Sequence, residues 1–267
     1  MLALLFAAAY AVLELAGVQL LGDETANKML TGGMLRIAAS VLLVVAVIRM
    51  RIDCMGFQGC SLKNLAVVAP CLLISLNNFP WIDALGGKLS LTRPELVALL
   101  ALECLSVGLF EELFFRGIVF PHMLRKRSGT KEGIFRAVIY SSALFSAYHL
   151  LNLFAGSGFG AVAMQMGYTF LFGGMLCFVL LWTKNIWLCA LLHAVYNFGG
   201  MYYSELGTGN IWSLGTILLT VFVSLAVAAY IAFVFIKRKL PYATELLPYR
   251  ENAESGDIQA ADDGEVS

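Results

Sequence analysis

The chain has 267 residues, of which 60% are hydrophobic and only 13% are charged, and its mean hydropathy is +0.80. A soluble domain is typically about 45–50% apolar and about 25% charged, so this composition excludes an ordinary soluble protein and predicts a membrane protein. The net charge of zero conceals a segregation of charge, because seven acidic residues and one base follow position 240, whereas the first 240 residues carry 17 bases and 11 acids.

Eight apolar stretches approach or reach the length of about 20 residues that a helix needs to cross a bilayer. They lie at residues 1–21, 31–50, 64–81, 95–120, 134–154, 161–182, 186–203 and 211–236. The first stretch lacks the basic region of a secretory signal peptide, so we interpret it as a transmembrane helix. We expect an all-α, polytopic protein with about eight transmembrane helices in a membrane-embedded domain, residues 1–240. An acidic, disordered cytoplasmic tail, residues 241–267, would follow it.

The basic residues of the connecting segments predict the orientation in the bilayer. Alternate connectors hold 12 Lys and Arg residues, whereas the opposite set holds only three, Lys28, Lys88 and Arg93. Because cytoplasmic loops are enriched in Lys and Arg, this pattern places both termini in the cytoplasm. The six cysteines have no CxxC spacing, and we expect the four in apolar stretches to be small core side chains. Cys54 and Cys60 share a short loop that we place in the cytoplasm, where we expect no lasting disulfide.

Three charges lie close together at the end of the fourth apolar stretch, in the sequence LFEELFFRGIVF. A charge at the centre of a bilayer is costly, so ionisable residues there are candidates for a functional site. Glu112 and Arg116 are four residues apart in the favourable order, which predicts an ion pair that gives structural support. Glu111 is rotated by about 100° from Glu112 and faces elsewhere. Glu103, Val107 and Glu111 follow each other at intervals of four residues, so Glu103 could line the same side as Glu111.

Two of the three histidines also lie in apolar stretches, whereas His122 lies at the end of a stretch and is expected to be solvated. His149 is followed three residues later by Asn152, and His193 is followed four residues later by Asn197, so each pair shares a helix face. A single histidine or asparagine in a membrane helix often serves only as an interhelical hydrogen-bonding group. A carboxylate, two histidines and an amide on three helices, however, are the groups that a hydrolytic site requires.

Hydrolysis of a peptide bond needs a base that activates a water and donors that stabilise an oxyanion. Glu111 is the candidate base, His149 could share the water, and His193 with Asn197 could donate to the oxyanion. The same Glu111, His149 and His193 side chains could instead bind zinc with an open position for water. The residues alone do not decide between a site with zinc and a site without metal.

The motifs resemble those of the CAAX-protease and bacteriocin-processing family of intramembrane endopeptidases. EELFFR at 111–116 matches the EExxxR motif of that family, FSAYH at 145–149 matches its FxxxH motif, and HAVYN at 193–197 matches its HxxxN motif. The resemblance covers about residues 95–200. It implies a prenyl-protease-like helical bundle that encloses an intramembrane polar cavity.

The resemblance also implies cleavage of a membrane-associated or prenylated (CAAX-type) protein, or of a peptide such as a bacteriocin leader. It implies Glu111 as the catalytic base with His149 as its partner on the water, and His193 and Asn197 as oxyanion stabilisers. It also favours a site without a cofactor or metal, with zinc as the alternative. The alternatives are a non-proteolytic member that acts as a membrane scaffold or bacteriocin-immunity protein, and a proton-coupled transporter. The expected partners are the substrate and the lipid bilayer, and no nucleic acid is expected.

Overall fold

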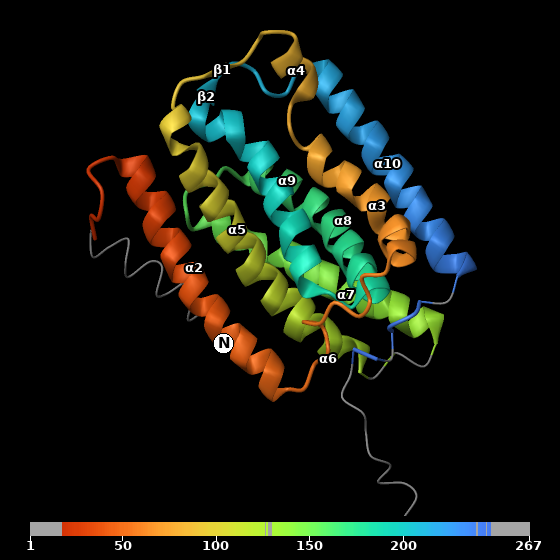
Figure 1. Cartoon of the computed structure of the whole chain (residues 1–267). Helices are drawn as coiled ribbons and strands as arrows, with labels where there is room; N and C mark the ends of the chain where they lie inside the picture. Colours follow the sequence, from red (N-terminus) through yellow and green to blue (C-terminus); the bar gives the residue numbers. More distant parts are fainter. Residues whose placement is uncertain (1–17, 126, 128–129, 239, 244, 247–267) are drawn as a thin grey trace, which may run out of the picture.

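A computed structural model of the chain describes residues 18–125, 127, 130–238, 240–243 and 245–246, which form a bundle of helices (Figure 1). The long helices are α2 (Glu24–Arg49), α3 (Leu62–Asn77), α5 (Val97–Phe114), α7 (Lys131–Tyr148), α8 (Phe159–Thr183), α9 (Ile186–Leu206) and α10 (Leu214–Lys237). The short elements are α4 (Trp81–Leu85), η1 (Pro94–Leu96), η2 (Phe115–Val119), α6 (Phe120–Leu124), η3 (His149–Leu153), β1 (Ser90–Leu91) and β2 (Gly207–Thr208). The predicted all-α class is confirmed, and the two short strands only pair with each other.

Polar side chains define where most of the long helices begin. In each case the residue before the helix has an extended backbone, and its side chain accepts a hydrogen bond from a backbone N–H of the first turn. These N-cap residues are Asp23, Ser61, Thr130, Asn185 and Ser213. The apolar stretches therefore become helices whose limits are set by the few polar residues between them.

The helix α5 has a central position in the bundle, where it packs against α9 on one side and α2 on the other. Figure 1 shows α2 at one edge and α10 at the other, with α5, α9 and α3 between them. Gly108 permits the close approach of α5 to α9, because a Cβ atom at this position would lie 2.5 Å from the carbonyl oxygen of Ala190. The helices α7 and α8 form a second closely packed pair.

Four helical segments in the described part of the chain are long and apolar enough to cross a membrane: Glu24–Arg49, Lys131–Leu153, Phe159–Thr183 and Leu214–Lys237. These helices agree with the prediction of a membrane protein. The first predicted span falls mostly on residues 1–17, which lie outside the described residues, and the count of eight spans stays a prediction. The fourth predicted span, 95–120, comprises η1, α5, the π-helical turn η2 and the first residue of α6.

The chain continues to pack against the body after the predicted domain boundary at residue 240. Leu246 is fully buried and Ala243 is nearly so, and the backbone N–H of Tyr242 donates to the carbonyl of Leu181. Lys184 pairs with Glu245 at 3.7 Å. The packed body therefore extends into the region where we expected the tail to begin, and the rest of that predicted tail, 247–267, lies outside the described residues.

All six cysteines are free thiols, as expected. Five are buried, whereas Cys60 is partly exposed. Cys54 lies in the loop after α2, and burial raises the pKa of its thiol to about 12. This thiol is therefore a small core side chain and is not reactive near neutral pH.

Candidate active site

The centre of the candidate site is the ion pair that the sequence predicts in the fourth apolar stretch. The Arg116 guanidinium donates from Nη1 to Oε1 of Glu112 at 3.0 Å, and both side chains are fully buried. The guanidinium carbon also lies 4.2 Å from the centre of the Phe145 ring, a cation–π contact. These contacts compensate two charges that would otherwise be costly inside a membrane helix.

A π-helical turn follows α5 at this point and includes Arg116. The N–H of Phe115 is shared between the carbonyls of Glu111 and Glu112, and the N–H of Phe120 donates to the carbonyl of Phe115, five residues earlier. Such turns widen an α-helix by one residue and are frequent at functional sites. The apolar stretch gave no sequence signal for this turn.

His193 on α9 lies between the two glutamates of α5. Its Nδ1 atom is 2.8 Å from Oε1 of Glu112, and its Nε2 atom is 3.7 Å from Oε2 of Glu111. A carboxylate only accepts hydrogen bonds, so Nδ1 carries a proton and donates to Glu112. Glu112 therefore contacts Arg116 and His193 through the same oxygen, whereas the sequence predicted only the pair with Arg116.

Several buried polar atoms of this cluster have no hydrogen-bond partner in the described protein. They are Oε2 of Glu111, Oε2 of Glu112, and Nε and Nη2 of Arg116. Buried polar groups are almost always paired, with protein atoms or with ordered water. Charged atoms without a hydrogen-bond partner therefore mark a place where a water or a polar group of a ligand would be stabilised.

His149 belongs to the same cluster through an aromatic residue. It follows α7 directly, and its Nδ1 atom lies 2.9 Å from the carbonyl oxygen of Phe145, to which it donates. The Phe145 ring lies 5.0 Å from the His149 ring and 5.9 Å from the His193 ring, measured between centroids. Among the described residues His149 forms no ion pair with Glu111, so the two predicted partners on the water are not in direct contact.

The other predicted polar residues have different positions. Asn197 is partly buried one turn after His193, and no described residue forms a hydrogen bond with its side chain. Glu103 lies two turns before Glu111 on α5, but its carboxylate pairs with Arg36 of α2 at 3.6 Å. Its partner is therefore a cation on α2, which sequence spacing alone could not reveal.

The metal alternative requires Glu111, His149 and His193 to converge. Within the described residues no three His, Cys, Asp or Glu side chains are grouped so that they could hold a metal ion. In both histidines Nδ1 donates, to a carbonyl in His149 and to Glu112 in His193, so only the Nε2 atoms could serve as ligands. The residues as arranged do not fit a metal, and we derive no step through one.

The comparison with protein families agrees with the motif resemblance. The model of the type II CAAX prenyl endopeptidase Rce1-like family matches residues 93–199. This segment includes the candidate residues from Glu111 to Asn197, whereas α2, α3 and α10 lie outside it. No curated protein and no solved structure matches the chain.

Proposed function

We propose that this chain, whose residues 93–199 form an Rce1-like domain, is an intramembrane endopeptidase that hydrolyses a peptide bond of a membrane-associated protein or peptide. The observation that carries the proposal is the buried cluster of Glu111, Glu112, Arg116 and His193, in which several charged atoms have no hydrogen-bond partner. A purely structural ion pair would not require this second carboxylate and imidazole.

In the proposed reaction Glu111 is the general base. Its Oε2 atom is buried and has no hydrogen bond, so it could accept a proton from a water. His149 donates from Nδ1 to the Phe145 carbonyl, which in the neutral ring leaves Nε2 as an acceptor for the second proton of that water. The water oxygen would then attack the scissile carbonyl. Glu111 would take the proton and deliver it to the nitrogen of the amine that leaves when the C–N bond breaks.

The oxyanion of the tetrahedral intermediate would be stabilised by His193 and Asn197. Because Nδ1 of His193 donates to Glu112, Nε2 can donate only when the ring carries both protons. The carboxylate of Glu112, 2.8 Å from Nδ1, fixes the orientation of the ring. Glu112 would thus be a positioning residue, which holds the ring without contacting the substrate.

The test is cleavage of defined peptides by the purified chain, with Glu111→Gln as the variant and Glu103→Gln as the matched control. Both substitutions neutralise a glutamate of α5, but Glu103 is paired with Arg36 and lies two turns away. Loss of a general base typically lowers the rate by about 10²–10⁴-fold, so we expect this loss for Glu111→Gln only. Undiminished cleavage by a folded Glu111→Gln protein would contradict the proposal and would favour a non-proteolytic member of the family.

The substrate is tested with two peptides, one prenylated at a CAAX-type end and one that carries a bacteriocin-type leader. Faster cleavage of the prenylated peptide is the result that we expect from the Rce1-like domain. The same assays with a chelator, and with added zinc, test the metal alternative. We expect both treatments to leave the rate unchanged.

A further inference from the structure

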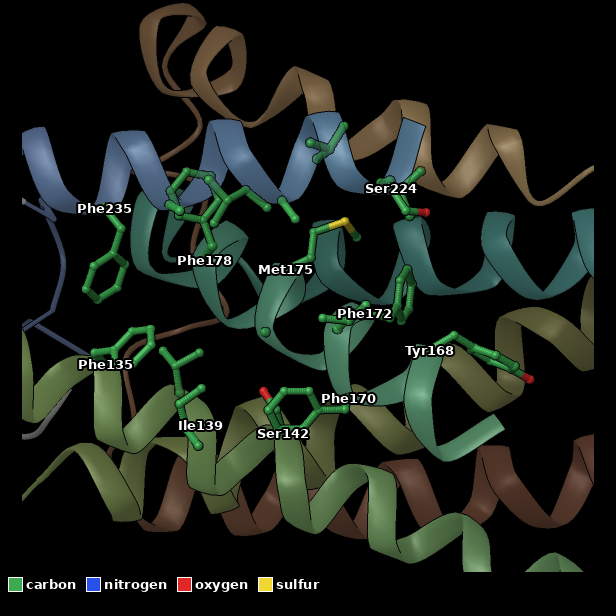
Figure 2. Close-up of a pocket in the computed structure, with 18 of the residues that line it drawn as sticks. Phe135, Ile139, Ser142, Tyr168, Phe170, Phe172, Met175, Phe178, Ser224 and Phe235 are labelled. Atoms are coloured by element: carbon green, nitrogen blue, oxygen red, sulfur yellow. The ribbon is translucent and has the colours of Figure 1, made fainter. Parts of the chain in front are cut away.

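A long apolar groove lies between α7 and α10, with α8 as its floor (Figure 2). Its volume is about 690 Å³, and it contains none of the candidate catalytic residues. Figure 2 shows side chains of all three helices around this space, among them Phe135 and Ile139 of α7, Met175 and Phe178 of α8, and Phe235. An empty groove of this kind would leave apolar atoms without contacts, so within a bilayer it requires an occupant.

The shape of the groove suits a single hydrocarbon chain. On α10 the lining extends from Thr220 to Ile236, which corresponds to about 24 Å at 1.5 Å per residue. One leaflet contributes about 15 Å of the roughly 30 Å hydrocarbon core, so the groove spans at least a full leaflet. One end is closed, because Lys131 donates from Nζ to the carbonyl of Ile236 and the rings of Phe135 and Phe235 are 5.8 Å apart.

Positive charge is concentrated at this closed end. Lys131, Lys237 and Arg238 are exposed there, at the first residue of α7 and at the end of α10. The nearby Glu132 is already paired with Arg136 at 2.6 Å, so the net charge at this end is positive. Basic residues at the ends of membrane helices attract anionic lipid headgroups, whereas a neutral hydrocarbon alone would not require them.

We propose that the groove binds one acyl chain of an anionic glycerophospholipid, with the phosphate at Lys131 and Lys237. The bound chain would also contact the candidate active site through one residue. Phe172 lines the groove, and its ring lies 5.3 Å from the His193 ring and 4.3 Å from the Tyr196 ring. The lipid therefore packs against the wall that holds His193, although it does not enter the cluster of charges.

The experiment measures the phospholipid that the full-length chain retains after purification from bilayers containing equal amounts of phosphatidylglycerol and phosphatidylcholine. Native mass spectrometry counts the bound molecules and identifies their headgroups. Ala228→Trp fills the groove, because Ala228 lines it. Ala229→Trp is the matched control, since Ala229 is the next residue of α10 and is also exposed but is not part of the groove lining. A third variant, Lys131→Gln/Lys237→Gln, removes charge and leaves the groove open.

We expect one tightly retained phosphatidylglycerol on the wild-type and Ala229→Trp proteins and none on Ala228→Trp. Each basic residue near an anionic surface changes the affinity by about fivefold, so the double glutamine variant should lose about thirtyfold of its preference for phosphatidylglycerol. Equal retention of both lipids, or equal retention by the two tryptophan variants, would overturn the proposal. Displacement of the lipid by a farnesylated peptide, one for one, would also overturn it and would identify the groove as a substrate site.

If Ala228→Trp does not fold, the double glutamine variant still decides the question. Its substitutions lie at exposed positions, outside the packed core. An unchanged preference for phosphatidylglycerol in this variant contradicts the proposal.

Discussion

Replacement of Glu112 by glutamine removes the negative charge from both contacts that this residue makes. Its Oε1 atom accepts from Arg116 at 3.0 Å and from His193 at 2.8 Å. At an effective dielectric constant of about 20, a full charge pair at the distance of His193 is worth about 6 kcal/mol. The loss of one oxyanion donor typically raises the activation free energy by only about 2.7–4 kcal/mol. The effect of Glu112→Gln on kcat cannot exceed this value, because Glu112 acts only through His193. We therefore expect kcat for peptide cleavage to fall by about 10²–10³-fold.

The same substitution also changes stability, because it leaves Arg116 as a buried cation without its partner. Breaking a buried pair costs about 3–5 kcal/mol, whereas replacing both members with neutral residues is often close to neutral. Arg116→Met alone should therefore lower the thermal unfolding midpoint. The double variant Glu112→Gln/Arg116→Met should recover most of this loss. If Glu112 positions His193, kcat stays low in this double variant although the stability returns.

The assays are cleavage kinetics and thermal unfolding of each purified variant. Because Glu112 orients the His193 ring, its loss should lower kcat with little change in KM, as for an interaction made only in the transition state. Recovery of wild-type kcat in the double variant would show that Glu112 only compensates the charge of Arg116, and would refute the reasoning.

Further predictions concern the scaffold. Gly108→Ala should lower the free energy of unfolding by about 1–3 kcal/mol, because the added Cβ atom would meet the backbone of α9. In Gly167→Ala the added Cβ atom meets nothing within 4 Å, so this control should not lower the free energy of unfolding in the same way. Hydrogen bonds from Ser213 and Thr216 hold the pKa of Asp83 below its ordinary value. Asp83→Asn should therefore lower the unfolding temperature at neutral pH. The difference from the wild type should disappear as the pH falls through the acidic range below the ordinary carboxyl pKa, where Asp83 becomes protonated. A difference that persists there would show that the charge is not the cause. With its raised pKa, Cys54 should resist alkylation by iodoacetamide at pH 8 until the protein is denatured, and rapid labelling of the folded protein would contradict its burial.

The sequence predicted the parts of the site that depend on local spacing. The ion pair of Glu112 and Arg116 follows from an interval of four residues on one helix, and the structure confirms it. The contact of His193 with Glu112 joins positions 81 residues apart, and nothing in either local sequence specifies it. It depends on the packing of α5 against α9, which a single glycine at position 108 permits.

Some helix limits marked by a polar residue were predicted closely, but α2 begins at Glu24, after the N-cap Asp23, seven residues before the expected start at 31. Thr130 and Asn185 cap α7 and α9 near the expected starts. The π-helical turn at 115–119 and the change to a 3₁₀-helix at His149 lie within apolar sequence. Hydrophobicity alone does not distinguish these helix types, because all of them bury the same side chains. Arg36 was likewise not predicted as the partner of Glu103, since the two residues lie on different helices.

The π-helical turn has a consequence for how the two halves of this helix face their neighbours. One extra residue rotates all following side chains by about 100° relative to an uninterrupted α-helix. The first half can therefore direct Glu111 and Glu112 toward α9, while Phe120 and Leu124 in the second half are fully buried in the core. Deleting one residue from 115–119 would restore a regular helix and turn one of these two faces away from its contacts. The chain thus carries, between α5 and α6, one extra helical residue that sets how the charged cluster is oriented relative to the apolar core.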